Sequence, residues 1–310
     1  MTDGTEGADN GAGRDASVLV ACDLRLGGRV FGPDERVIMA IVNRTPDSFY
    51  DKGATFAEAD ALVAVERAVA EGADIIDIGG VKAGPGDEVD TAEEIRRTIP
   101  FIAKIRALYP DVVISADTWR AEVGRAACEV GADLLNDTWA GFDPALAEVA
   151  AEYRVGIVCT HTGGHPPRTR PRPGVAYDDV MADILQRTLA LAERAEALGV
   201  ARESILIDPT HDFGKTARHS LEATRRLDEM TATGRPVLVS VSNKSFIGET
   251  LDLPAPRRLI GAMATTAICA WHGARVYRAH QVAETRQALD MVSSIQGLRP
   301  PLKFVRGAPV

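Results

Sequence analysis

The chain has few cysteines and no long apolar segment. Its four cysteines, Cys22, Cys128, Cys159 and Cys269, lie far apart in apolar contexts and form neither a CxxC pair nor a metal-ligand spacing. We therefore expect reduced core thiols rather than disulfides or zinc ligands. No run of eighteen apolar residues occurs, and the first residues lack the basic and apolar regions of a signal peptide. A cytoplasmic protein without a membrane partner is therefore expected.

The sequence also lacks an excess of positive charge. Lysine and arginine number 35 against 44 aspartates and glutamates, which gives a formal net charge of −9. Phosphate backbones and anionic membranes attract basic surfaces, so nucleic acid is not an expected partner. This balance favours a small-molecule ligand.

Composition divides the chain into a tail and one large domain. Residues 1–16 are rich in Gly, Asp and Thr and cannot bury much apolar area, which predicts a disordered tail. Residues 17–310 contain no linker or change of composition, and with 45% hydrophobic residues in the whole chain they are long enough for one large core. We expect a single domain over 17–310.

Short apolar runs alternate eight times with longer segments of helical period, which predicts an α/β protein with a parallel sheet. The expected strands cover 37–42, 74–79, 112–117, 133–137, 156–161, 204–208, 236–242 and 275–280. A doubly wound sheet would give the same alternation. Polar residues at nearly every strand end favour a (β/α)8 TIM barrel, whose sites collect at the C-terminal face. Residues 18–36, with Gly27-Gly28 at their centre, predict a short N-terminal hairpin that closes the barrel floor.

Polar residues end most of these expected strands: Asn43, Asp117, Asn136, Asp137, His161, Asp208, Ser242, Asn243, Lys244, Arg278 and His280. Two carboxylates and a carboxamide, Asp117, Asp208 and Asn136, suit a flat heterocycle with amino and ring N–H donors. Lys244 supplies a donor for the opposite edge of such a ring. Arg278 and His280 are two residues apart on a strand and face one side. Beside Asn43 they predict an anion or metal-anion pocket, with a structural ion pair as the alternative interpretation.

One loop carries a specific motif. Asn43-Arg44-Thr45-Pro46-Asp47-Ser48-Phe49 resembles the N-x-TPDSF loop of the dihydropteroate synthase family. Further matches follow in the same order, at 115–118, 136–137, 208–209, 213–215, 242–244 and 278–280. The resemblance implies an enzyme of folate biosynthesis that joins p-aminobenzoate to 6-hydroxymethyl-7,8-dihydropterin pyrophosphate. It also implies Mg²⁺ as the cofactor that assists loss of pyrophosphate, and a homodimer formed through helices of the C-terminal part of the barrel.

The resemblance further implies a role for each matching residue. The pterin would be bound by Asp117, Asn136, Asp208 and Lys244. Magnesium-pyrophosphate would be held by Asn43, Arg278 and His280, with Asn43 as the metal ligand. The acceptor amine would contact Thr45, Phe49 and Phe213. Asp117, Lys244, Arg278 and His280 would take part in catalysis.

Three loops depart from the family pattern. Gly84 and Asn243 stand where the family's G-E-S-T-R-P-G and S-R-K segments place arginines, and the glycine-rich D-P-G-F-G-F-G-K segment has become Asp-Pro-Thr-His-Asp-Phe-Gly-Lys at 208–215. The last change puts bulk and a carboxylate near the acceptor. We therefore expect p-aminobenzoate condensation to be weak or lost while pterin binding is kept.

Two further functions stay open at this stage. The combination N-R-T-P-D-S-F and G-V-K-A-G-P-G is similar to a divergent second paralogue of actinomycetes whose synthase activity is doubtful, which suggests a non-catalytic pterin-binding protein. The other alternative is a transferase for a different phosphorylated substrate, suggested by Arg44, Lys82, His211 and the basic stretch 168–172.

Overall fold

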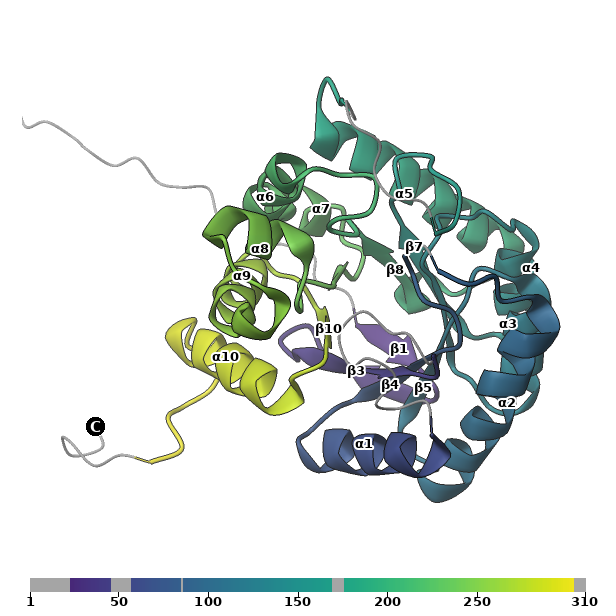
Figure 1. Cartoon of the computed structure of the whole chain (residues 1–310). Coiled ribbons are helices and arrows are strands. Elements are labelled where there is room, and N and C mark those ends of the chain that lie inside the picture. The colour runs from purple at the N-terminus through teal and green to yellow at the C-terminus, as the bar shows by residue number, and fades with distance from the viewer. Residues whose placement is uncertain (1–22, 46–56, 85, 169–175, 304–310) are drawn as a thin grey trace, which may run out of the picture.

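The computed structural model describes residues 23–45, 57–84, 86–168 and 176–303. Eight parallel strands form its central sheet, in the order β8-β7-β6-β5-β4-β3-β10-β9. A bridge between Ile207 and Val237 joins the two ends of this sheet, so the strands close into a barrel (Figure 1). The predicted tail of 1–16 and Phe49 lie outside the described residues.

The strand positions agree with those expected from the sequence to within one residue at each end, except that the seventh strand, expected at 236–242, covers only two residues. The eight strands are β3 (Val37–Asn43), β4 (Ile75–Gly79), β5 (Val113–Asp117), β6 (Leu134–Asp137), β7 (Gly156–Thr160), β8 (Ile205–Asp208), β9 (Leu238–Val239) and β10 (Val276–Ala279). The predicted TIM barrel is confirmed, since consecutive strands pair in parallel and a helix follows each of them.

The lower half of the barrel interior is entirely apolar. Alternate side chains of every strand point inward, and those nearest the strand starts form one buried cluster with the hairpin: Leu24, Leu26, Phe31, Val37, Met39, Ile75, Val113, Leu134, Val158, Leu206, Leu238 and Val276. This buried cluster fills the end of the barrel at the strand starts, so a ligand site is expected at the C-terminal ends of the strands.

The predicted hairpin is present in the described residues. β1 (Leu24–Leu26) pairs antiparallel with β2 (Arg29–Phe31). The two residues of its turn, Gly27 and Gly28, have φ of +55° and +75°. A two-residue turn with positive φ at both positions matches the twist of the flanking strands, and glycine adopts it without a steric penalty.

Helices surround the barrel: α1 (Glu58–Ala70), α2 (Thr91–Leu108), α3 (Ala121–Glu129), α4 (Ala145–Tyr153), α5 (Val180–Leu198), α6 (Ala217–Arg225), α7 (Leu227–Thr231), α8 (Ser245–Leu251), α9 (Leu259–Trp271) and α10 (Val282–Ile295). Their apolar faces pack on the outward side chains of the strands in a second, larger core. Within the described ranges, no helix combines the length and apolarity that a membrane crossing requires.

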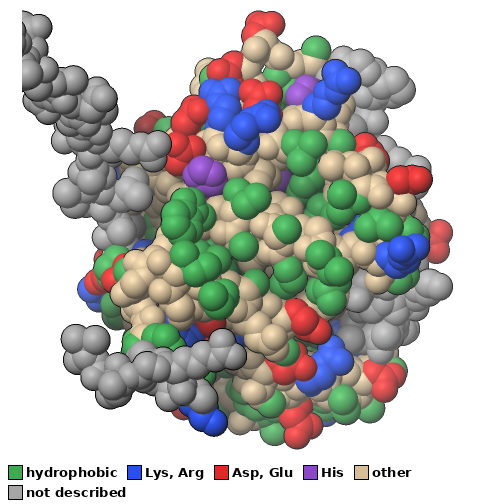
Figure 2. Space-filling model, turned by 90° about the vertical axis from the view of Figure 1, so that its left-hand side faces the viewer, with side chains coloured by type: hydrophobic (Ala, Val, Ile, Leu, Met, Phe, Trp, Pro, Cys, Tyr) green, Lys and Arg blue, Asp and Glu red, His purple; other side chains and the backbone are tan. Residues whose placement is uncertain are grey.

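One side of the molecule exposes large apolar side chains. Figure 2 faces this side, which is formed by α8, α9 and α10, and hydrophobic side chains gather across it. Its most exposed members are Leu251, Ile260, Ile268, Trp271, Met291 and Ile295, of which Ile260 is 84% exposed. Patches of this kind mark interaction surfaces more often than free surface.

Candidate ligand site at the barrel mouth

The upper half of the barrel interior is polar. The same alternation that directs apolar side chains inward near the floor brings Asp77, Asp117, Asn136, Asp208 and Arg278 inward near the mouth. The strand pairing therefore brings together the predicted pterin residues Asp117, Asn136 and Asp208.

Arg278 lies between two carboxylates. Its Nε lies 2.6 Å from Asp77 Oδ2 and its Nη2 lies 2.6 Å from Asp117 Oδ2. The structure thus has the ion pair that was the alternative interpretation for Arg278. Burial raises the pKa of Asp117 to about 6, although Arg278 favours its ionised form. The Thr138 hydroxyl donates to the other oxygen of Asp117.

Asp77 is a site residue that the motif comparison missed. Its side chain is fully buried, and it accepts hydrogen bonds from Ser115 Oγ at 2.6 Å and from Asn136 Nδ2 at 3.3 Å in addition to Arg278. The signal was present in the strand, because the two-residue period places Asp77 between the inward positions Ile75 and Gly79. Burying a charged side chain without a partner is unfavourable, so an ionisable residue at such an inward position of an apolar strand predicts a partner inside the barrel.

A third carboxylate, that of Asp208, lies at the mouth on β8. Asp208 is 3% exposed, and the backbone amide of Thr210 donates to its Oδ1 at 2.6 Å. Burial raises the pKa of Asp208 to about 6, against the opposing effect of Lys244 and Lys215. Lys244 is the N-cap residue of α8, and its Nζ lies 4.6 Å from the centre of the Phe213 ring. Burial lowers the pKa of Lys244.

The residues predicted to hold magnesium-pyrophosphate lie at adjacent strand ends. Asn43 ends β3, and β10, which pairs with β3, leads directly into His280. The backbone amide of His280 donates to Ser242 Oγ at 3.3 Å, and its Nδ1 lies 3.2 Å from the same hydroxyl. Burial and the nearby Arg278 lower the pKa of His280 to about 3, so the imidazole is neutral at pH 7.

Thr45 and Phe213, predicted to contact the acceptor, occupy different environments. Thr45 is 2% exposed and its hydroxyl has no hydrogen-bond partner in the described part of the chain. Phe213 packs edge-on against Trp139, with 5.1 Å between the ring centres. A buried hydroxyl without a partner is uncommon and suits a group that a ligand satisfies.

Two of the polar strand-end residues do not face the mouth. The Asp137 carboxylate turns away and accepts from the backbone amides of Trp139 and Gly141, so it stabilises a loop. His161 also points outward, where its Nε2 lies 2.6 Å from Asp183 Oδ1 on α5. The strand alternation places these two side chains on the helix side of the sheet, so they are not part of the candidate site.

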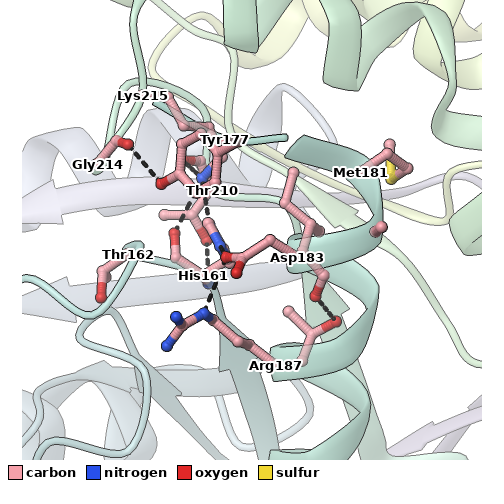
Figure 3. A network of polar contacts seen from close by, with 12 residues as sticks. His161, Thr162, Tyr177, Met181, Asp183, Arg187, Thr210, Gly214 and Lys215 are labelled. Carbon is pink, nitrogen blue, oxygen red and sulfur yellow. Dashed lines mark hydrogen bonds and ion pairs between the residues drawn. The ribbon is translucent and has the colours of Figure 1, made fainter. Parts of the chain in front are cut away.

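His161 belongs to a network that holds the loop after β8 (Figure 3). The Lys215 ammonium lies 2.7 Å from His161 Nδ1 and donates to the carbonyls of His161, Thr210 and Phe213, each at 3.1 Å. A lysine donates to Nδ1, so the imidazole proton is on Nε2 and donates to Asp183. Burial lowers the pKa of Lys215 to about 7 and that of His161 to about 3. This network holds residues 209–215 from the side of the loop that faces α5.

The loop after β4 is held by an arginine from elsewhere in the chain. Arg168, in the loop after β7, donates through Nε to the carbonyls of Lys82 and Gly84 at 3.2 and 3.3 Å, and through Nη1 to that of Asp87 at 2.7 Å. Gly84 stands where the family pattern has arginine, so a guanidinium does reach this loop. This guanidinium, that of Arg168, donates to backbone carbonyls of the loop and so holds the loop in place.

Two residues that suggested a different transferase are directed elsewhere. Arg44 lies against α2, where its Nε donates to the carbonyl of Arg97 at 3.4 Å and its guanidinium lies 4.8 Å from the centre of the Phe101 ring. His211 is fully buried and stacks on Phe246. Neither position supports a new cationic subsite at the mouth.

The comparisons with known proteins agree with this geometry. The family model described as "Pterin binding enzyme" matches residues 39–280. The chain belongs to the pterin-binding enzyme family. Within it, the chain is similar to proteins named "Inactive dihydropteroate synthase 2", for example that of Mycobacterium tuberculosis strain H37Rv, at 57% identity over 90% of this chain and 89% of the relative. It is 37% identical to the dihydropteroate synthase of Escherichia coli K12 over 83% of this chain and 90% of the relative.

Solved structures of pterin-binding enzymes have the same fold. The dihydropteroate synthase of Yersinia pestis in a sulfonamide drug complex superposes with a TM-score of 0.84 at 33% identity, covering 89% of this chain and all of the other. That of Coxiella burnetii in complex with pteroic acid gives a TM-score of 0.79 at 30% identity, covering 89% of this chain and 99% of the other. The resemblance drawn from the sequence motifs is thus confirmed at the level of family and fold.

Proposed function

We propose that the barrel mouth binds a pterin or its pyrophosphate and that condensation with p-aminobenzoate is weak or lost. The proposal of pterin binding rests on the hydrogen-bond acceptors and donors at the mouth, which belong to Asp117, Asn136, Asp208 and Lys244. Buried carboxylates of this kind match the amino and ring N–H groups of a pterin, and Lys244 matches the opposite edge. The pteroic acid complex of the C. burnetii relative supports this assignment.

Arg278 would have different partners before and after the ligand binds. In the ligand-free protein it pairs with Asp77 and Asp117. On pterin binding Asp117 would accept from the ligand instead, and Arg278 and His280 would lie beside the leaving pyrophosphate. Catalytic roles for Asp117, Lys244, Arg278 and His280 are part of this proposal. Stabilising charge on a leaving group is the usual contribution of such an arginine.

Asn43 would be the magnesium ligand. Mg²⁺ prefers oxygen ligands and is commonly bound through one or two protein groups together with substrate phosphates. No group of three or more His, Cys, Asp or Glu residues that could hold a metal occurs among the described residues, so the ion would depend on the Asn43 oxygen and the pyrophosphate. When bound, Mg²⁺ would neutralise the charge that develops on pyrophosphate.

Weak or absent turnover is proposed from the rim. Gly84 and Asn243 stand where the family pattern places arginines, and Arg168 and Arg258 use their guanidinium groups on backbone carbonyls nearby. Loss of an arginine that pairs with a desolvated anion costs a few kcal/mol, or a factor on the order of a hundred in rate or affinity. The name "inactive" given to the mycobacterial relatives is consistent with this proposal.

Calorimetry tests the binding half of the proposal. We expect heat with 6-hydroxymethyl-7,8-dihydropterin pyrophosphate and Mg²⁺ in the native protein, and a loss of affinity on the order of a hundredfold in Asp208→Ala, because the buried acceptor of the ring is removed. Asp228→Ala on α7, whose side chain is 64% exposed, is the control and should bind normally. Absence of heat in the native protein would remove pterin binding.

A coupled assay tests the catalytic half. Pyrophosphate release with p-aminobenzoate should stay near background in the native protein. Turnover comparable to that of the E. coli enzyme, measured side by side, would show instead that the altered loops support synthesis.

We also propose that the apolar face of α8, α9 and α10 forms a homodimer, because hydrophobic side chains gather on this side of the molecule (Figure 2). The large side chains of Ile260, Trp271 and Met291, on α9 and α10, are exposed. Sedimentation should give a dimer for the native protein and a monomer for Ile260→Glu. A monomeric native protein at micromolar concentration would contradict this proposal.

A further inference from the structure

The corner of the mouth around Lys244 differs from the family pattern in electric charge. Asn243 occupies an arginine position, which removes one positive charge. Asp212 occupies a glycine position of D-P-G-F-G-F-G-K, which adds one negative charge. Both changes act in the same direction and lie on two different loops, so the corner is two charge units more negative than the family pattern.

The carboxylate of Asp212 is held in a defined place. It accepts from the backbone amides of Ser245 and Phe246, with 3.1 Å between Oδ1 and the Phe246 nitrogen. These two residues directly follow Lys244. Among the charged groups near Lys244, Asp212 has the largest effect on the Lys244 pKa, and its negative charge favours the protonated ammonium. The carboxylate therefore lies beside Lys244 and is anchored rather than free in solvent.

The backbone at Asp212 shows that this carboxylate is retained at a cost. Asp212 has φ of +73°, a left-handed conformation that suits the glycine of the family pattern. Such a conformation is unfavourable for a residue that has a Cβ atom. The hydrogen bonds to α8 and one from its own amide to Ser220 Oγ at 3.1 Å offset it.

Asp212 also adjoins the acceptor side of the pocket. The next residue, Phe213, is the predicted acceptor contact, and its ring lies 4.6 Å from Lys244 Nζ. Asn243 is 5% exposed, and its side-chain amide nitrogen has no partner in the described part of the chain. The corner thus offers an uncharged donor and a fixed negative charge to whatever group extends from the pterin.

We propose that Asp212 determines acceptor specificity: it excludes an aromatic amine that carries a carboxylate and admits one that is uncharged at the end opposite its amino group. This inference rests on the proposed pterin binding. In the condensation the amine nitrogen bonds to the pterin methylene carbon while the carbon–oxygen bond to pyrophosphate breaks. Pyrophosphate keeps the electron pair and the amine loses one proton. Asp212 takes no part in these bonds and acts on the far end of the acceptor.

Pteroate and its carboxamide test the proposal directly. Each is a pterin already joined to the amine, and the two differ only in the charge at the far end. Calorimetry should show that the native protein binds the carboxamide at least about tenfold more tightly, because adjacent like charges weaken binding. In Asp212→Asn and Asp212→Gly this ratio should fall to about one or reverse.

The two variants control for folding. Asparagine tolerates positive φ and keeps an oxygen for the Ser245 and Phe246 amides, whereas glycine relieves the backbone. Thr210→Gly is the matched control, since Thr210 also has positive φ, at +52°, at a glycine position of the same loop and carries no charge. Its ratio should equal that of the native protein.

Three results would overturn the inference. The first is tighter binding of pteroate than of the carboxamide by the native protein. The second is an unchanged ratio in Asp212→Asn, and the third is an equal fall in Thr210→Gly. Binding of 6-hydroxymethylpterin is measured in every variant. If pterin binds and the ratio does not change, only the role of Asp212 fails. If pterin does not bind to the native protein, the proposed function fails and this inference fails with it.

Discussion

Two parts of the barrel mouth are built in different ways. Its floor is formed by polar side chains of the strands, above the apolar end that the hairpin closes, and its rim is formed by the loops that follow the strands. In the floor, Asp77, Asp117 and Arg278 come from strands, and Arg278 pairs with each of the two carboxylates at 2.6 Å. In the rim, Asp212 and Asn243 come from loops and have positive φ. Strand register fixes the floor, because moving one of its residues would displace a whole strand. Loops tolerate replacement, so a pterin-binding enzyme can alter its acceptor side while its pterin side stays in place.

The largest expected effect concerns the floor. Asp77→Ala removes a fully buried carboxylate and leaves Arg278 with one partner instead of two. Breaking a buried ion pair from one side costs about 3–5 kcal/mol, and we expect the free energy of unfolding, measured in urea, to fall by that amount. Asp60→Ala on the exposed face of α1 should change it by less than about 0.5 kcal/mol. An Asp77 variant as stable as the control would mean that the floor is not held by its charges.

The next effect concerns the network behind the rim. Burial lowers the pKa of Lys215 to about 7 from an unfolded value of 10.5. Between these values the unfolded chain binds more protons than the folded protein, so stability rises with pH across this window. Lys215 should contribute roughly 2 kcal/mol of added stability between pH 7.5 and 9.5.

Lys215→Met tests this by comparison with the native protein. The difference in free energy of unfolding between the two should vary with pH, whereas the exposed Lys104→Met should follow the native curve. A constant offset between native protein and Lys215→Met across pH 7.5–9.5 would show that Lys215 stays charged in the folded state.

A smaller effect is expected on pterin affinity. Burial raises the pKa of Asp208 to about 6, so at pH 5 only about a tenth of the protein has this carboxylate ionised. An ionised carboxylate accepts two hydrogen bonds from the ring, and 6-hydroxymethylpterin should therefore bind roughly tenfold more weakly at pH 5 than at pH 7.5. Titration calorimetry at both pH values measures the ratio of the two affinities. Asp208→Asn should lower this ratio, and the part that remains is expected from Asp117, whose pKa burial also raises to about 6. Equal affinity at the two pH values would exclude Asp208 as the titrating acceptor.

The smallest effect on stability is expected at the rim itself. Arg168→Ala removes the hydrogen bonds to the carbonyls of Lys82, Gly84 and Asp87. These bonds are partly exposed, so the free energy of unfolding should fall by less than about 1 kcal/mol. Hydrogen exchange should nevertheless become several-fold faster over 82–87, because the loop loses its clamp. Arg67→Ala on α1 serves as the control, and unchanged exchange in Arg168→Ala would mean that the loop is held by other contacts.

Much of the site could be predicted from the sequence. Asp117, Asn136, Asp208 and Lys244 were found because polar residues at strand ends stand out against apolar runs. Asp77 was missed because it lies inside such a run, and its inward direction follows only from the register of β4. Asp137 and His161 also end strands, yet they point to the helix side, since a position at a strand end does not tell which face its side chain points to.

The sequence by itself determined the alternation of strands and helices, because the period of apolar residues is a local property of the chain, and the polar strand ends favoured a barrel over a doubly wound sheet. It also determined which polar side chains stand at the strand ends. Only the tertiary structure decided how these side chains pair. Arg278 and Asp77 are 201 residues apart, and they meet because β10 pairs with β3 and β3 with β4. The position of the Asp212 carboxylate beside Lys244 likewise depends on the packing of two loops, which no local pattern specifies.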